Sequence, residues 1–141
     1  MGDAHANFVR IAPVLMVSDV QASAAYYRDK LGFNYDRFWG EPPTFVMLRR
    51  DGLMIMLAEH SHGDGPGDTN PNGRVSGHED QWDAYIWVDD VDVLYEEVKA
   101  AGATIFSELC NTFYDLREFQ ISDPDGYQIG FGGPIPGSDD G

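Results

Sequence analysis

Side chains that commonly bind metals gather near the middle of the chain. His60, His62 and His78 share with Asp64 a segment, residues 60–80, that is rich in glycine and polar residues. A His-x-His pair can chelate a transition metal, because neutral imidazole is a common metal ligand. A glycine-rich segment gives such ligands no rigid support, and it suits an exposed linker or a lid. We therefore interpret these histidines as solvated, with a relocated metal site as the alternative.

One carboxylate near the end of the chain could take part in acid–base chemistry. Glu118 follows Arg117 in an alternating segment, and burial would make its carboxylate more basic. An ion pair at a strand edge explains the same two residues without any reaction. The single cysteine, Cys110, is expected to be a small buried residue and not a nucleophile. Glu118 is therefore the candidate catalytic residue, since the sequence has no phosphate-binding loop, nucleophile elbow or zinc-protease motif.

The elements that must position these groups belong to a motif that occurs twice. Residues 15–32 combine an apolar strand, an aspartate that can cap a helix, a helical pattern and a final glycine, and residues 86–102 repeat that order. A hairpin signal follows each copy, at 51–52 and at 123–126. A repeat of about 70 residues is too long for one solenoid unit. We infer a duplicated βαβββ module in one pseudo-symmetric domain, with any active centre between the halves.

The predicted fold class is α+β, with a single domain over residues 1–141. Helices are expected at 20–31, capped by Ser18 or Asp19, and at 91–101, capped by Asp90, and a glycine ends each of them. Strands are expected at 9–17, 33–39, 45–50, 53–58, 82–88, 116–122 and 127–131, and within 103–110. The expected parts of the domain are module one at about 8–59, a linker at about 60–80, module two at about 81–132 and a tail at 133–141.

Alternation along the expected strands gives each sheet two different faces. One face is aliphatic, as in the predicted hairpin pairs Val46–Leu57 and Leu48–Ile55, and is expected to lie under the helices. The other face combines apolar side chains with a few polar groups, which is typical of a ligand pocket. Packing against a partner subunit is the alternative for this face. The candidate ligand-binding residues are Trp39, Phe45, Met47, Met54, Met56, Asp83, Tyr85, Trp87, Glu118 and Gln120.

The net charge of the chain limits the classes of partner that it can bind. A formal net charge of −15 excludes nucleic acid and anionic membranes as ordinary partners, because phosphate binding needs clustered lysine and arginine. The same charge would concentrate a cationic ligand, although it also serves simply to keep a protein in solution. No apolar run approaches the ~20 residues that span a bilayer, and residues 1–5 lack the features of a signal peptide. With a single cysteine, these features predict a cytoplasmic protein with a small-molecule partner.

Six short motifs resemble those of a known family. They are Val17–Val20, Ala25–Phe33, Val88–Val91, Lys99–Ala103, Arg117–Phe119 and Asp123–Tyr127. Through these motifs residues 9–132 resemble the glyoxalase/bleomycin-resistance/extradiol-dioxygenase superfamily, also called vicinal oxygen chelate proteins. The resemblance implies two βαβββ modules whose curved mixed sheets enclose a cleft, usually in a homodimer. It is weaker evidence for chemistry, because one fold hosts many functions.

The resemblance also implies where a metal would bind. Family enzymes usually hold a divalent metal with His, Gln or Glu at matching positions of both modules, and these positions are Ala12, Met56, Asp83 and Gly130 in this chain. Among them, Asp83 alone offers a side-chain donor for a hard cation, whereas catalytic divalent sites normally take three or more protein ligands. We therefore expect no metal at these positions and no cofactor.

Without that metal, the resemblance points to ligand capture. The metal-dependent reactions of the family use the metal as a Lewis acid, whereas bleomycin-resistance-like members bind and sequester a drug, and residues 45–57 resemble theirs. We expect a metal-independent, homodimeric protein that binds a cationic aromatic drug or metabolite, with Trp82 as a further stacking ring. One alternative is a lyase, isomerase or dioxygenase-like enzyme that uses relocated ligands or Glu118 acid–base chemistry. Another is a module that assembles with a second protein.

Overall fold

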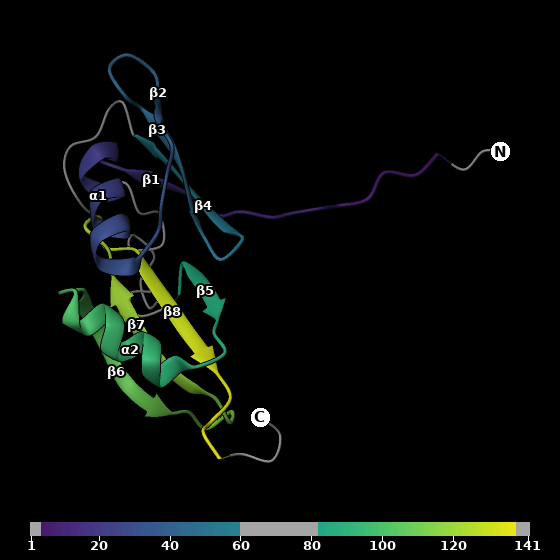
Figure 1. Ribbon diagram of the computed structural model, residues 1–141, viewed down its shortest axis with the longest axis vertical. Helices are drawn as coiled ribbons and strands as arrows, with labels where there is room; N and C mark the ends of the chain where they lie inside the picture. Colours follow the sequence, from purple (N-terminus) through teal and green to yellow (C-terminus); the bar gives the residue numbers. More distant parts are fainter. Residues whose placement is uncertain (1–3, 60–81, 138–141) are drawn as a thin grey trace, which may run out of the picture.

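The computed structural model describes residues 4–59 and 82–137, which form two sheets and two helices (Figure 1). The strands are β1 (Val14–Val17), β2 (Phe38–Trp39), β3 (Phe45–Arg50), β4 (Leu53–Glu59), β5 (Ala84–Trp87), β6 (Thr104–Asn111), β7 (Arg117–Ser122) and β8 (Gln128–Gly133). The helices are α1 (Val20–Leu31) and α2 (Val91–Ala100). This arrangement confirms the predicted α+β class with two similar modules. The histidine-containing linker predicted at 60–80 lies outside the described residues.

The sheet of module one has the strand order β1-β4-β3-β2. Its tight turn places Asp51 at φ 51° and Gly52 at φ 83°, the pair of left-handed residues that a type I′ hairpin needs. This turn sets the register of β3 and β4, so Val46 pairs with Leu57 as the sequence predicts. Both side chains are fully buried, which confirms that the aliphatic face forms the core.

The sheet of module two has the strand order β5-β8-β7-β6. In the turn between β7 and β8, the N–H of Gly126 donates to the carbonyl of Asp123 over 3.0 Å, and Ile121 then pairs with Ile129 as predicted. Strand β6 lies at the edge of the sheet and its register with β7 shifts twice. Its Cys110 is exposed, so the prediction of a buried cysteine is wrong, because an edge strand is covered on one side only.

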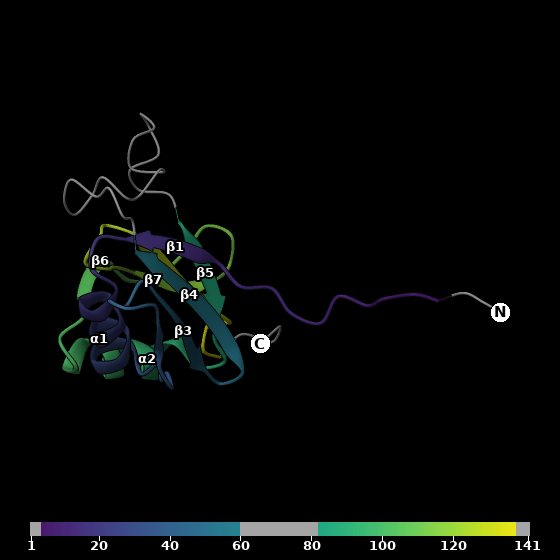
Figure 2. The same cartoon turned by 90° about the horizontal axis from the view of Figure 1, so that it is seen from above.

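Both helices begin at aspartates, Asp90 as predicted for α2 and, of the two predicted candidates for α1, Asp19 and not Ser18. The carboxylate of Asp19 accepts the N–H groups of Gln21 and Ala22 at 3.1 Å, and that of Asp90 accepts the N–H of Val93 at 3.1 Å. Such caps satisfy N–H groups that the first helical turn leaves without partners. The two helices cover the same side of the sheets (Figure 2), which leaves the other side for the predicted ligand face. Within the described ranges, neither helix is long and apolar enough to cross a membrane.

The two modules share one hydrophobic core, and hydrogen bonds from the end of module two secure the arrangement. The hydroxyl of Tyr127 donates to the carbonyl of Met16 at 2.8 Å and accepts the N–H of the same residue at 3.0 Å. The hydroxyl of Tyr27 on α1 donates to Asp123 at 2.8 Å. These bonds hold the β7–β8 turn against β1 and α1, and they thereby set how the two sheets face one another.

Candidate ligand-binding site

A cavity of about 490 Å³ lies where β4 and the segment before β1 approach β5. Four of the predicted ligand residues line it, Met54 from module one and Asp83, Tyr85 and Trp87 from module two. Its remaining lining residues, which include Ile11, are mainly aliphatic. Apolar walls with a few fixed polar groups are typical of sites that bind small molecules. The structure therefore brings residues of both modules together at one cavity.

The predicted ligand residues of β2, β3 and the middle of β4 do not line this cavity. Phe45, Met47 and Met56 are half-buried and share the predicted ligand face, as the register of β3 and β4 shows. Trp39 on β2 is 42% exposed, and the guanidinium of Arg37 lies 3.6 Å from its ring centre. These side chains extend the ligand face across module one without entering the cavity.

Three aromatic rings follow one another beside the cavity, and we call Trp82, Tyr85 and Trp87 the ring row. The ring centre of Tyr85 lies 4.5 Å from that of Trp82 and 5.2 Å from that of Trp87, both in edge-to-face geometry. On the neighbouring β8, a Cβ atom at Gly130 would lie 2.8 Å from Trp82 Cδ1, and one at Gly132 would lie 1.7 Å from Tyr85 Oη. The two glycines therefore provide the space that the rings occupy.

The carboxylate of Glu118 on β7 fixes the position of Tyr85, the middle residue of the ring row, through a hydrogen bond. It is 6% exposed and accepts the hydroxyls of Tyr85 at 3.0 Å and Tyr114 at 2.7 Å. Burial and this carboxylate raise the pKa of Tyr114 to about 12 and raise the pKa of Tyr85 as well, so both hydroxyls stay protonated at neutral pH. Arg117 forms its ion pair with Asp92 of α2 at 2.9 Å. This geometry supports a positioning role for Glu118, and its role as a general base stays a prediction.

Gln120 brings a polar atom with no partner to the same face. Its side-chain Oε1 is buried, and no hydrogen bond reaches it within the described part of the chain. The residue pairs with Gly130 across β7 and β8, next to the ring row. A buried acceptor without a donor costs about 1–3 kcal/mol, and Gln120 is not among the residues that line the cavity. The role of Gln120 as a ligand residue stays a prediction.

The positions where the resemblance implies metal ligands offer one suitable side chain. Ala12, Met56 and Gly130 bring a methyl group, a thioether and bare backbone, none of which is a donor for a hard divalent cation. Asp83 remains, and its Oδ2 accepts the N–H of Gln128 at 2.8 Å. Across residues 4–59 and 82–137, no group of three His, Cys, Asp or Glu side chains could hold a metal ion. This donor set does not fit a catalytic divalent metal.

Sequence reasoning missed Tyr114 and the role of Gly132. The alternation of Gly130 and Gly132 along β8, opposite the aromatic alternation of Tyr85 and Trp87 on β5, is a signal that could have revealed the packing of rings on glycine. Tyr114 had no such signal, because it lies in the turn between β6 and β7. That turn brings its hydroxyl to the carboxylate four residues further along the chain.

Comparison with known proteins identifies the family of this fold. The model of the Glyoxalase/Bleomycin resistance protein/Dioxygenase superfamily matches residues 7–131. This chain belongs to that superfamily. The match spans both modules, and it confirms the resemblance found in the sequence motifs.

Individual members of the superfamily resemble the chain along most of its length. The bleomycin resistance proteins of Geobacillus stearothermophilus and Staphylococcus aureus are each 29% identical to it over 127 residues, which cover 84% of this chain and 92% of theirs. A bleomycin-binding protein from bleomycin-producing Streptomyces verticillus, solved with copper(II)-bleomycin, is 25% identical, with a TM-score of 0.66 and coverage of 90% of this chain and 97% of that one. The antibiotic binding protein TnmS3 from Streptomyces sp. CB03234 shares the fold at 20% identity, with a TM-score of 0.67 and coverage of 94% and 100%.

Proposed function

We propose that this protein binds and sequesters a small aromatic molecule, a drug or a metabolite, that carries a positive charge. The observation that carries the proposal is the ring row beside the cavity of about 490 Å³. Aromatic rings offer stacking partners for planar ligands, and the flexible thioether of Met54 adapts to irregular apolar shapes. The superfamily relatives named for bleomycin resistance support a ligand of this kind.

The charge around the ring row supports the cationic part of the proposal. Asp83 lines the cavity, and the buried carboxylate of Glu118 lies 3.0 Å from the hydroxyl of Tyr85. A cation above an aromatic face is attracted by the negative face of the ring, and the net charge of −15 draws cations toward the molecule as a whole. A ligand with both a planar ring and a positive group would gain from each of these interactions.

Metal independence is the second part of the proposal. The family positions Ala12, Met56 and Gly130 contribute no ligating atom, and Asp83 is engaged with the backbone of β8. Capture by aromatic and apolar contacts needs no Lewis acid. The enzymatic alternative with relocated ligands depends on histidines outside the described residues. Metal analysis of protein purified without chelators tests it, because a stoichiometric bound metal would favour the enzyme.

We also propose that the protein acts as a homodimer in the cytoplasm. Residues 4–10 extend away from module one (Figure 1), and Phe8, Val9 and the neighbouring Ile11 are almost fully exposed. Burial of such apolar side chains under another surface lowers the free energy of the assembly. The partner that we propose is a second copy of the chain. The free thiol of Cys110 is consistent with a reducing compartment.

Calorimetric titration with bleomycin, a cationic aromatic drug, tests the binding function. We expect saturable binding by the wild-type protein and at least a roughly tenfold loss of affinity in Trp87→Ala, because Trp87 is a stacking ring that lines the cavity. Phe106→Ala is the matched control, since Phe106 is an exposed ring on β6 that does not line the cavity, and it should bind like the wild type. Equal binding by all three proteins would rule out the ring row as the site, and no saturation with any cationic aromatic compound would rule out the function.

A further inference from the structure

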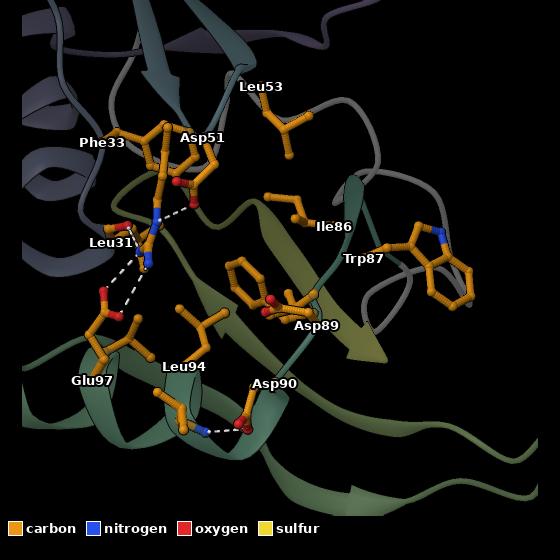
Figure 3. Close-up of a pocket in the computed structure, with 15 residues that line it drawn as sticks. Leu31, Phe33, Asp51, Leu53, Ile86, Trp87, Asp89, Asp90, Leu94 and Glu97 are labelled. Carbon is orange, nitrogen blue, oxygen red and sulfur yellow. Dashed lines mark hydrogen bonds and ion pairs between the residues drawn. The ribbon is translucent and has the colours of Figure 1, made fainter. Parts of the chain in front are cut away.

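A second cavity, of about 540 Å³, lies on the helix side of the molecule between the β3–β4 hairpin and α2 (Figure 3). We call it the helix-side groove. Leu53 and Ile86 line both cavities, so the two adjoin. Met54 lines the ring-row cavity alone, whereas Leu94 lines the groove alone. Each cavity therefore has its own reporter side chain.

The floor of the groove is apolar and partly open. Phe33, Ile86 and Phe131 contribute buried or half-buried side chains. Leu53 at the hairpin is 50% exposed and Val93 on α2 is 61% exposed. Apolar surface that is open to water in a concave site gains free energy when a ligand covers it.

The rim of the groove is acidic on both sides. Asp51 and Glu97 lie on one side, and Asp89 and Asp90 lie on the other (Figure 3). The cationic side chain of the lining, Arg50, already donates to Glu97 at 2.8 Å and to Asp51 at 3.3 Å. Four carboxylates against one guanidinium leave a formal charge of −3 around the apolar floor.

We propose that the helix-side groove is a second binding site, for a small molecule with an apolar body and a cationic group. The floor would bury the apolar body, and the carboxylates on both sides would hold the positive group. The volume of about 540 Å³ suits a drug-sized ligand. A second copy of this chain is a poorer occupant, because it would bring its own net charge of −15 to an acidic rim. The groove shares Trp87 with the ring row, but Asp89, Asp90 and Leu94 line the groove alone.

Two probes of the same shape and opposite charge test the proposal by methyl NMR. Tetraphenylphosphonium is the cation and tetraphenylborate is the anion. We expect tetraphenylphosphonium to shift the methyl signals of Leu94 and Val93 in a saturable way, with an affinity that falls as salt is added. Tetraphenylborate should leave both signals unchanged at the same concentrations. The methyl signal of Met54 reports separately on the ring-row cavity, so failure of either site is visible without the other.

Two variants separate the groove from the general charge of the protein. Val93→Arg places a positive, bulky side chain at an exposed helical position of the groove, and it should abolish the Leu94 shift while leaving the Met54 response intact. Ala100→Arg is the control, because Ala100 is an exposed residue of α2 outside the groove and the change in net charge is the same. Its Leu94 shift should match that of the wild type.

The double variant Asp51→Asn/Asp89→Asn removes charge without adding bulk. Asparagine tolerates the φ of 51° at residue 51, and affinity for tetraphenylphosphonium should fall roughly threefold to tenfold, since exposed ion pairs are individually weak. Asp36→Asn/Asp115→Asn is the control with equal charge change away from the groove. The proposal is overturned if the cation gives no Leu94 shift, if the anion binds equally well, or if Val93→Arg changes the oligomeric state instead of blocking the probe.

Discussion

At the scale of single residues, the glycines of β8 determine which side chains fit on the ligand face. The rings of Trp82 and Tyr85 occupy space that a Cβ atom at Gly130 or Gly132 would fill. Neither glycine has a positive φ, so the backbone conformation does not require glycine at these positions. The reason for glycine is the close packing of the rings on the strand. The same absence of a side chain at Gly130 removes a metal-ligand position and makes room for an aromatic wall.

Substitution at Gly132 tests this packing. We expect Gly132→Ala to lower the free energy of unfolding by about 1–3 kcal/mol, because the new methyl group would overlap the hydroxyl of Tyr85. Urea denaturation measures the change. In a Tyr85→Leu background, where the ring is already gone, the same substitution should cost much less. Equal costs in the two backgrounds would show that the ring does not need the glycine.

At the scale of elements, local sequence sets the hairpin registers but not the length of β1. The turn at Asp51 and Gly52 fixes the pairing of β3 with β4, because two left-handed residues define a tight hairpin. The alternating pattern of residues 9–17 predicts a longer strand than the observed Val14–Val17. Pro13 has no N–H to donate, and its carbonyl accepts the N–H of Met56. An alternating hydrophobic pattern shows which residues are able to form a strand. The length of the partner strand determines how many of them form hydrogen-bonded pairs.

The β7–β8 turn is the element whose stability should depend on pH. Burial raises the pKa of Asp123 to about 6, an effect increased by the charge of Asp125 and opposed by hydrogen bonds such as that from Tyr27. An unfolded aspartate titrates near pH ~4, so the folded state binds this proton more tightly. The stabilising contribution is therefore complete below the unfolded pKa and is lost as pH rises through about 6.

Urea denaturation between pH 7 and pH 4 measures that contribution. Relative to Asp123→Asn, the wild-type protein should gain stability as the pH falls, by an upper limit of about 3 kcal/mol at ~1.4 kcal/mol per pKa unit. Asp36→Asn, at an exposed aspartate, should follow the wild type. Parallel curves for the wild type and Asp123→Asn would contradict a raised pKa at this turn.

At the scale of the whole molecule, the ligand site depends on how two similar halves pack. The duplicated motif predicted both modules and the face that carries Asp83, Tyr85 and Trp87. It did not predict that Met54 alone of the module-one candidates would reach the cavity. That selection depends on the position of one sheet against the other, which is set by long-range bonds such as Tyr127 to Met16. No periodic pattern in the sequence encodes such bonds.

The exposed apolar segment before β1 makes a prediction about assembly. We expect Phe8→Ser/Val9→Ser to weaken the proposed dimer by at least roughly tenfold, because each buried apolar side chain contributes about 1.5–3 kcal/mol. Sedimentation velocity over a range of protein concentrations measures the dissociation. Phe113→Ser, at an exposed ring in the turn after β6, is the control and should sediment like the wild type. A monomeric wild-type protein would contradict the proposal.

The proposed function is capture of a cationic aromatic ligand without a metal. The most direct measurement is calorimetric titration of chelator-treated protein with ethidium, a planar aromatic cation that does not chelate metals, repeated after addition of zinc or manganese ions to the protein. We expect saturable binding in the chelated sample, with little change when the ions are added, because Ala12, Met56 and Gly130 cannot ligate them. Binding that appears only with a stoichiometric divalent ion at Asp83 would contradict capture without a metal.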